Sequence, residues 1–100
     1  MHEPQPEPVE AQREVTVCNP QGLHARPAMQ FVDTAARFAS DVRVRCRDAV
    51  VDGKSAMDML TLGATAGSAL TVMARGQDAA EAVEALAALV EKSFSEGDKT

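Results

Sequence analysis

Two residues that could take part in phosphate chemistry stand close together near residue 25. His24 and Arg26 lie two positions apart, and Pro27 follows them directly. Proline fits the first turn of a helix and disfavours helical angles at the residue before it, so this order predicts a helix that begins close to Arg26. The free N–H groups at a helix start and the positive end of its dipole favour anions. The pair therefore lies where a phosphate group would be stabilised.

The two side chains offer different parts of this chemistry. A histidine can act as a covalent nucleophile, and a positive helix start disfavours the charged form of the His24 imidazole. Arg26 has a fork of donors that can hold phosphoryl oxygens. The chain has no glycine-rich phosphate loop, no acidic cluster for magnesium and, outside the N-terminal segment that contains His2, no second histidine. The stretch could carry a phosphoryl group but not take one from a nucleotide unaided. Without further information, residue chemistry favours a helix cap or a loop residue as the role of His24.

Composition excludes several classes of function. A chain of 100 residues makes one domain, and its net charge of -5 with three aromatic residues, all Phe, gives no basic face or stacking platform for nucleic acid. The absence of a long apolar run and of signal-peptide features predicts a cytoplasmic protein that does not insert into a membrane. Cys18 and Cys46 form no CxxC motif and are expected to be ordinary strand residues in a reducing compartment. We expect no cofactor and no metal.

The elements that must position His24 can be read from hydrophobic periodicity. We expect a disordered, acidic, proline-rich tail over 1–13, a domain over 14–97 and a short C-terminal tail over 98–100. Alternation predicts a strand over 15–18 before the turn that leads to His24. The helix after Arg26 should bury a stripe at three- and four-residue spacing. The residues of that stripe are Ala28, Phe31, Val32, Ala35, Ala36 and Ala39.

The second half of the chain predicts a hairpin, two helices and a further strand. Alternating valines and arginines over 42–47 favour a strand with a basic solvated face, joined to the strand 49–51 by a tight turn at Arg47-Asp48. Ser55 should cap a two-turn helix, with Asp58 three residues later. A strand follows over 69–74, and Asp78 with Glu81 should form the capping box of the last helix, which Gly97 can end. Its expected buried stripe is Ala79, Ala82, Val83, Leu86, Ala87, Val90 and Phe94.

This order of elements, βαββαβα, predicts an α+β fold. A few strands with a hairpin in the middle favour a four-stranded antiparallel sheet. The three helices should cover one face of the sheet, so the fold is an open-faced β-sandwich. We expect the other face to be solvated.

Three segments together resemble one family. The stretches GLHARPA, DGKSAMDMLTLGATAGSALTVMARG and AAEAVEALAALVEKSF are similar to HPr, the histidine-containing phosphocarrier of the phosphoenolpyruvate-dependent sugar phosphotransferase system. The resemblance covers about residues 14 to 96. It implies a monomeric phosphocarrier, not a stand-alone enzyme, that accepts a phosphoryl group from Enzyme I and passes it to IIA domains of sugar permeases.

The resemblance also implies roles for particular residues. His24 would be the phosphoryl acceptor, Arg26 would neutralise the phosphoryl oxygens, and the N–H groups of Ala25 and Arg26 would complete the cradle. The docking surface for partners would lie on the first helix and the short second helix, with Met57 and Leu60 exposed and Met59 and Leu62 in the core; exposed methionine suits such a surface. Asp58 adds an acid to this surface. The residues carried over to it are Met29, Gln30, Asp33, Ala56, Met57 and Leu60.

Ser55 has a structural and a regulatory interpretation. As the first residue of the short helix it is an N-cap. In part of the family the matching serine is phosphorylated by an ATP-dependent HPr kinase/phosphorylase, which turns the carrier off and makes it a ligand of regulators. A phosphate at Ser55 would place negative charge beside the apolar docking surface and could block Enzyme I without unfolding the domain.

The sugar-system carrier has three alternatives. The first, with the same chemistry, is a regulatory or nitrogen-branch homologue whose phosphorylation state is sensed. A metal module of Cys18, His24 and Cys46 has ligand spacing that matches no closed zinc pattern. A cysteine or serine hydrolase would lack an identifiable base and orienting group.

Overall fold

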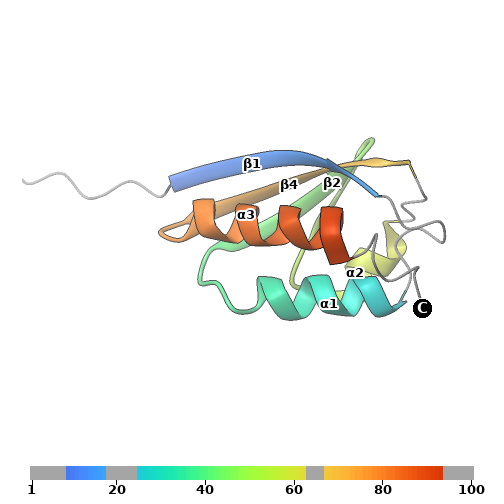
Figure 1. Ribbon diagram of the computed structural model, residues 1–100, viewed down its shortest axis with the longest axis horizontal. Helices are drawn as coiled ribbons and strands as arrows, with labels where there is room; N and C mark the ends of the chain where they lie inside the picture. The colour runs from blue at the N-terminus through green and yellow to red at the C-terminus, as the bar shows by residue number, and fades with distance from the viewer. Residues whose placement is uncertain (1–8, 18–24, 63–66, 94–100) are drawn as a thin grey trace, which may run out of the picture.

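A four-stranded antiparallel sheet with the strand order β1-β4-β2-β3 forms the body of the computed structural model (Figure 1). The structure describes residues 9–17, 25–62 and 67–93. Three helices pack on the sheet, in the predicted order βαββαβα, and a short π-helical turn follows the last one. The elements are β1 (Val9–Thr16), α1 (Ala25–Ala35), β2 (Asp41–Cys46), β3 (Ala49–Asp52), α2 (Ala56–Thr61), β4 (Ala69–Gly76), α3 (Ala79–Ala88) and η1 (Leu89–Ser93).

The core lies between one face of the sheet and the helices. Along β2, Val42, Val44 and Cys46 are buried while Arg43 and Arg45 are exposed, which is the alternation that the sequence predicted. Each buried valine or larger side chain contributes about 1.5–3 kcal/mol relative to an exposed one. From α1 the core receives Phe31, which is fully buried. The predicted stripe of the last helix is confirmed for Ala79, Ala82, Val83, Leu86, Ala87 and Val90.

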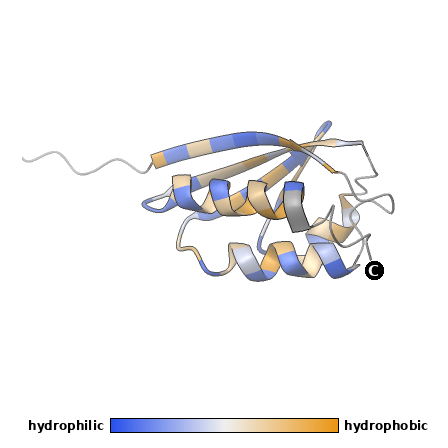
Figure 2. Cartoon of the chain, in the orientation of Figure 1, coloured by the Kyte–Doolittle hydropathy of each residue, from blue (hydrophilic) through white to orange (hydrophobic). Residues whose placement is uncertain are grey.

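Strand β1 begins earlier than its sequence pattern predicts. Residues 9–13 were expected to belong to a disordered tail, but they pair with β4 from Val9, opposite Gly76, onward. Figure 2 shows β1 as hydrophilic along most of its length, so hydropathy did not reveal the first residues of the strand. Backbone pairing along β4 and the packing of Ala11 against the core stabilise this part of the strand. The predicted tail boundary at residue 13 is therefore wrong.

Helix α1 ends before the predicted apolar stripe does. Ala28, Phe31 and Ala35 are buried and Val32 is partly buried, as expected. The helix stops at Ala35, and the last two alanines of the stripe, Ala36 and Ala39, are exposed in the turn before β2. A single methyl group gains little from burial, so alanine spacing alone did not define the end of the helix.

The N-terminus of α3 differs from the predicted capping box. Asp78 occupies the N-cap position, but its side chain makes no cap hydrogen bond within the helix. Its carboxylate instead accepts hydrogen bonds from the N–H groups of Ala39 and Ser40, at 2.8 Å and 2.9 Å, and from the Ser40 hydroxyl. The predicted box with Glu81 is wrong, because the turn before β2 offers unpaired N–H groups to the same carboxylate.

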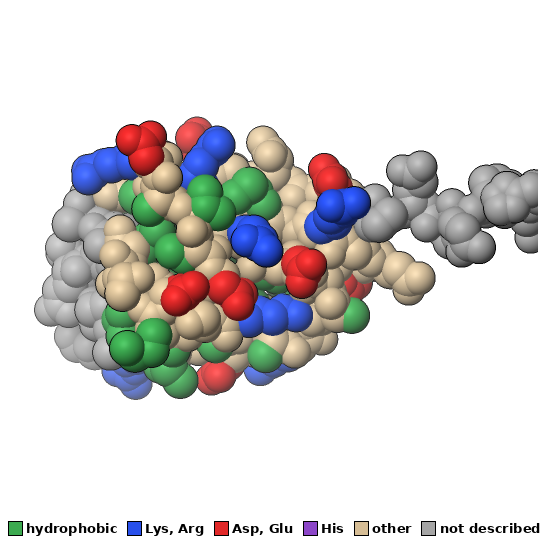
Figure 3. All heavy atoms as spheres, turned by 180° about the vertical axis from the view of Figure 1, so that it is seen from behind, with side chains coloured by type: hydrophobic (Ala, Val, Ile, Leu, Met, Phe, Trp, Pro, Cys, Tyr) green, Lys and Arg blue, Asp and Glu red, His purple; other side chains and the backbone are tan. Residues whose placement is uncertain are grey.

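The remaining sheet face is solvated, as predicted. From behind, charged side chains of both signs are intermingled with hydrophobic ones across the molecule (Figure 3). The β2–β3 hairpin pairs Cys46 with Ala49, so Arg47 and Asp48 form its two-residue turn. Arg47 takes a positive φ of 58°, which supplies the turn geometry that a glycine more often gives.

Some predicted features lie outside the described residues. These are His2, Cys18, His24, Phe94, Gly97 and the tail over 98–100. Among the helices that the structure describes, none is long and apolar enough to cross a membrane.

Candidate functional site

The start of α1 is the described part of the predicted phosphate site. The helix begins at Ala25, so the residue that precedes it in the chain is His24, which itself lies outside the described residues. The first N–H groups of a helix have no partner within it, and those of Ala25 and Arg26 belong to this set. Pro27 follows, has no N–H to leave unpaired, and is buried. The first turn contains no acidic residue that would offset the positive end of the helix.

Arg26 begins a solvated stripe along α1. Its side chain is exposed, and no carboxylate pairs with it within the described ranges. Met29, Gln30 and Asp33 follow at helical spacing and are all exposed, with Met29 at 47% of its full accessible area. Four predicted site residues therefore share one face of α1, and that face starts at the end of the helix next to residue 24.

Helix α2 adds a second exposed apolar surface. It packs against α1, and in Figure 1 it lies toward the end at which α1 begins. Met57 is 72% exposed and Leu60 41%, whereas Met59 and Leu62 are buried, which confirms the predicted division of this helix into surface and core. Ala56 is half-buried. We call Met29, Met57 and Leu60 the apolar patch.

Ser55 is the N-cap of α2, as predicted. It has extended backbone angles, and its hydroxyl oxygen accepts a hydrogen bond from the Asp58 N–H at 3.2 Å. The reciprocal half of the predicted capping box is not made. The Ser55 N–H donates to the Asp52 carbonyl at 3.1 Å, and the Asp58 carboxylate accepts from the Asp52 N–H at 3.3 Å. Asp58 therefore closes the turn before the helix.

The turn from β3 to α2 contains two residues that the sequence analysis overlooked. Asp52 accepts a hydrogen bond from the Lys54 N–H through its carboxylate at 2.9 Å. The Lys54 amine donates to the Phe38 carbonyl at 2.8 Å and so ties this turn to the segment after α1. Aspartate side chains often accept a hydrogen bond from the backbone N–H two residues later and so form a turn. The Asp52-Gly53-Lys54 order could have revealed this role of Asp52. No sequence pattern would have paired Lys54 with Phe38.

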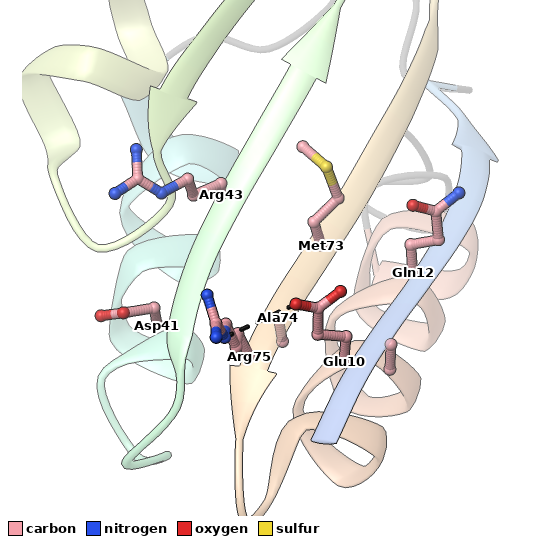
Figure 4. A pocket seen from close by; sticks show the side chains of 8 residues that line it. Glu10, Gln12, Asp41, Arg43, Met73, Ala74 and Arg75 are labelled. Atoms are coloured by element: carbon pink, nitrogen blue, oxygen red, sulfur yellow. Dashed lines mark ion pairs between the residues drawn. The ribbon is translucent and has the colours of Figure 1, made fainter. Parts of the chain in front are cut away.

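A shallow hollow of about 440 Å³ lies elsewhere, on the solvated face of the sheet. Figure 4 shows the polar side chains from β1, β4 and β2 around it, on the side of the sheet away from the helices. Its polar groups have mixed charge and include an ion pair between Arg75 and Glu10, 3.5 Å apart and both well exposed. The hollow is lined by residues near the beginning of β1 and the end of β4, whereas in Figure 1 α1 begins toward the end of the sheet where β1 finishes. The hollow is therefore separate from the start of α1.

The described residues contain no group of three or more His, Cys, Asp or Glu side chains placed to hold a metal ion. Cys46 is buried in β2. The metal module named above as an alternative would also need Cys18 and His24, which lie outside those ranges.

Comparison with known proteins identifies the family. Residues 11–92 match the family model described as the phosphorylation site of the PTS HPr component. The chain is 41% identical over 87 residues to the phosphocarrier protein HPr of Pseudomonas putida, which covers 86% of this chain and 97% of that protein. A solved structure of HPr-C-His from Thermoanaerobacter tengcongensis superposes with a TM-score of 0.81 at 38% identity, over 86% of this chain and 97% of that one.

An HPr dimer structure from the same organism is also similar, with a TM-score of 0.68 at 37% identity, covering 94% of this chain and 98% of that one. The family match, the sheet order and the helix that begins directly after His24 agree with one another. The chain belongs to the HPr family of phosphocarrier proteins of the phosphotransferase system.

Proposed function

We propose that this chain carries a phosphoryl group on His24, which it receives from phosphorylated Enzyme I and passes to IIA domains of sugar permeases. The observation that carries the proposal is the start of α1 at Ala25, directly after His24. A phosphoryl group on that histidine would lie near the unpaired N–H groups and the positive end of the helix. The first turn has no carboxylate that would repel it.

Arg26 acts as the phosphate-stabilising side chain in this proposal. It is exposed and has no carboxylate partner among the described residues, so its guanidinium is available to an incoming phosphoryl group. Charge-assisted hydrogen bonds to phosphoryl oxygens are about twice as strong as those between neutral groups. The N–H groups of Ala25 and Arg26 complete the cradle.

The apolar patch is the docking surface for Enzyme I and for IIA domains. Two exposed methionines and a leucine, on the helix that follows His24 in the chain and on the helix packed against it, suit partners that must bind in turn and then leave. Gln30, Asp33 and Ala56 border the patch and would take part in contacts with these partners. The histidine then reacts only when a partner supplies the rest of the active site.

Ser55 is the regulatory position of the proposed carrier. Its side chain is half-exposed at the N-cap of α2, two residues from Met57 in the apolar patch. A phosphate placed there by an HPr kinase/phosphorylase would bring about 1.5–2 negative charges next to the docking surface. Enzyme I would then bind less well, while the phosphorylated form could bind regulators.

We propose that the chain acts in the cytoplasm as a monomer. The outer edge of β1 has no neighbouring strand among the described residues, and the strand carries Glu10, Arg13 and Glu14. Charged residues on an edge strand discourage pairing with a second copy.

The test is incubation with labelled phosphoenolpyruvate and Enzyme I. The wild-type chain should acquire an acid-labile label, and the His24→Ala variant should not. An acid-labile label that persists in the alanine variant would contradict the assignment. IIA domains are then added to the labelled chain. Transfer of the label to a sugar-type IIA domain supports the sugar-system carrier, whereas transfer only to a nitrogen-type IIA domain supports the regulatory alternative.

A further inference from the structure

Two carboxylates enclose the turn in which Ser55 lies. Asp52 accepts from the Lys54 N–H through its side chain at 2.9 Å, and from the Ser55 N–H through its carbonyl at 3.1 Å. Asp58 accepts from the Asp52 N–H at 3.3 Å. These hydrogen bonds hold one acidic side chain three residues before Ser55 and another three residues after it. Both negative charges are thus fixed on the segment that would receive a regulatory phosphate.

The basic residue next to Ser55 does not offset these charges. The Lys54 amine donates to the Phe38 carbonyl at 2.8 Å, which directs it toward the segment that follows α1. Of the ion pairs between described residues, neither involves Lys54, Asp52 or Asp58. A phosphate on Ser55 would therefore be added to a turn that holds two carboxylates, while the amine of the adjacent lysine is engaged elsewhere.

Asp58 is the more directly placed of the two acids. Its N–H donates to the Ser55 hydroxyl oxygen, the atom that would bear the phosphate, at 3.2 Å. Side chains three residues apart at a helix start lie on the same side of the turn, where like charges repel. Asp58 is only half-exposed, so solvent screens it less than a fully exposed carboxylate.

We propose that Asp58 lowers the rate at which Ser55 is phosphorylated, so that it sets how readily the carrier can be switched off. This inference rests on the regulatory part of the proposed function. In the reaction the Ser55 hydroxyl oxygen attacks the γ-phosphorus of a nucleoside triphosphate. An O–P bond forms, the bond from the γ-phosphorus to the β–γ bridging oxygen breaks, the nucleoside diphosphate leaves and the hydroxyl proton is released. The entering group carries negative charge throughout, and Asp58 opposes its approach.

The experiment compares the full chain with its Asp58→Asn variant as substrates of an HPr kinase/phosphorylase with labelled ATP. Asparagine keeps an oxygen that can accept from the Asp52 N–H and removes only the charge. The matched control is Asp48→Asn, which changes the net charge equally but lies exposed in the β2–β3 turn. A Ser55→Ala variant shows that the label belongs to Ser55.

Asp58→Asn should raise the initial rate of Ser55 labelling by about threefold to tenfold, as expected for one half-exposed like-charge interaction. Asp48→Asn should remain near wild type. An unchanged or lower rate for Asp58→Asn overturns the proposal, and so does an equal rise in both variants, because that result would reflect net charge alone. The absence of labelling in wild type and Asp58→Asn, with a known HPr labelled alongside, also overturns it.

Labelling of the same preparations by Enzyme I separates these results from the carrier function. If His24 accepts label while Ser55 does not, the regulatory proposal fails and the carrier proposal remains.

A second measurement needs no kinase: Ser55→Glu places a negative charge at the cap, both in the wild-type chain and in the Asp58→Asn variant. The loss in urea midpoint caused by Ser55→Glu should be larger with Asp58 present, and equal losses would contradict the proposed repulsion.

Discussion

Ser40 and Asp78 are joined by a hydrogen-bond cluster that connects the start of β2 to the start of α3. The Asp78 carboxylate accepts from the Ser40 hydroxyl, from the Ser40 N–H at 2.9 Å and from the Ala39 N–H at 2.8 Å. Ser40 is buried although it is polar, so these bonds satisfy groups that water does not reach. The hydrogen bonds from Ser40 and Ala39 lower the pKa of the Asp78 carboxyl below its ordinary value of 3.8.

This cluster predicts a specific loss of stability in acid. Because the pKa of Asp78 is lower in the folded than in the unfolded chain, its contribution is fully present above pH 3.8 and is lost as pH falls through the folded pKa. Asp78→Asn should lower the free energy of unfolding at neutral pH, and its difference from wild type should shrink in acid. Urea unfolding from neutral pH down to about pH 2 measures this difference.

Asp48→Asn is the control for the acid experiment, because its side chain is exposed in the β2–β3 turn. Its free energy of unfolding should follow wild type across the same range. A difference between wild type and Asp78→Asn that stays constant with pH would show that Asp78 acts through packing and not through its charge.

Gly76 is the position at which a methyl group should disturb the same cluster. It has φ of 151°, and an added Cβ would lie 2.8 Å from the Ser40 Cα. Gly76→Ala should cost about 2–4 kcal/mol of unfolding free energy, from backbone strain together with the displacement of Ser40. Thermal and urea denaturation would measure the loss.

Gly67→Ala is the control that separates the cost of backbone strain from the cost of displacing Ser40. Gly67 also has a positive φ, of 86°, but a Cβ there would meet nothing within 4 Å. This variant should cost only about 1 kcal/mol, the strain of the left-handed region. Equal losses at the two glycines would mean that contact with Ser40 has no energetic consequence.

The sequence predicted elements whose burial follows a regular period. The alternation of Val42 and Val44 with Arg43 and Arg45 specified β2, and the spacing from Ala79 to Ala87 specified α3. Prediction from the sequence failed where a side chain or strand is held by hydrogen bonds to a segment that is distant in the chain. Nothing near Asp78 indicates that its carboxylate binds the turn at Ser40.

In the candidate site too, features set by the local sequence were predicted and features set by distant contacts were not. Pro27 located the start of α1 and Ser55 the start of α2, because each acts on its own turn. The early part of β1 was missed because its stability comes from pairing with β4, which its local hydropathy does not reveal. The bond from Lys54 to Phe38 likewise depends on how α1 and the β3–α2 turn meet.

The apolar patch should affect transfer without affecting stability. Met57 is 72% exposed, so Met57→Ala should change the free energy of unfolding by less than about 0.5 kcal/mol. It should raise the KM for the carrier in the Enzyme I reaction by about threefold to tenfold, since a patch methionine anchors the partner. Steady-state transfer from phosphoenolpyruvate measures this.

Two variants serve as references for Met57→Ala. Val50→Ala removes another exposed hydrophobic side chain from β3, outside the patch, and should leave the KM unchanged. Met59→Ala removes a fully buried one and should cost about 2–5 kcal/mol of stability. A KM that rises as much for Val50→Ala would place docking on a different surface.

Arg26 should matter for phosphoryl transfer and not for folding. Its side chain is exposed and makes no ion pair with a described residue, so Arg26→Ala should leave the unfolding midpoint unchanged. Loss of a charge-assisted hydrogen bond to a phosphoryl group is worth about 1.5–3 kcal/mol, so kcat/KM for transfer should fall by about tenfold to a hundredfold. Arg37→Ala, which removes an exposed arginine just after α1, is the matched control and should transfer like wild type. Transfer at the wild-type rate by Arg26→Ala would show that Arg26 does not serve the phosphate. Unfolding of this variant at a lower urea concentration would show that Arg26 supports the fold.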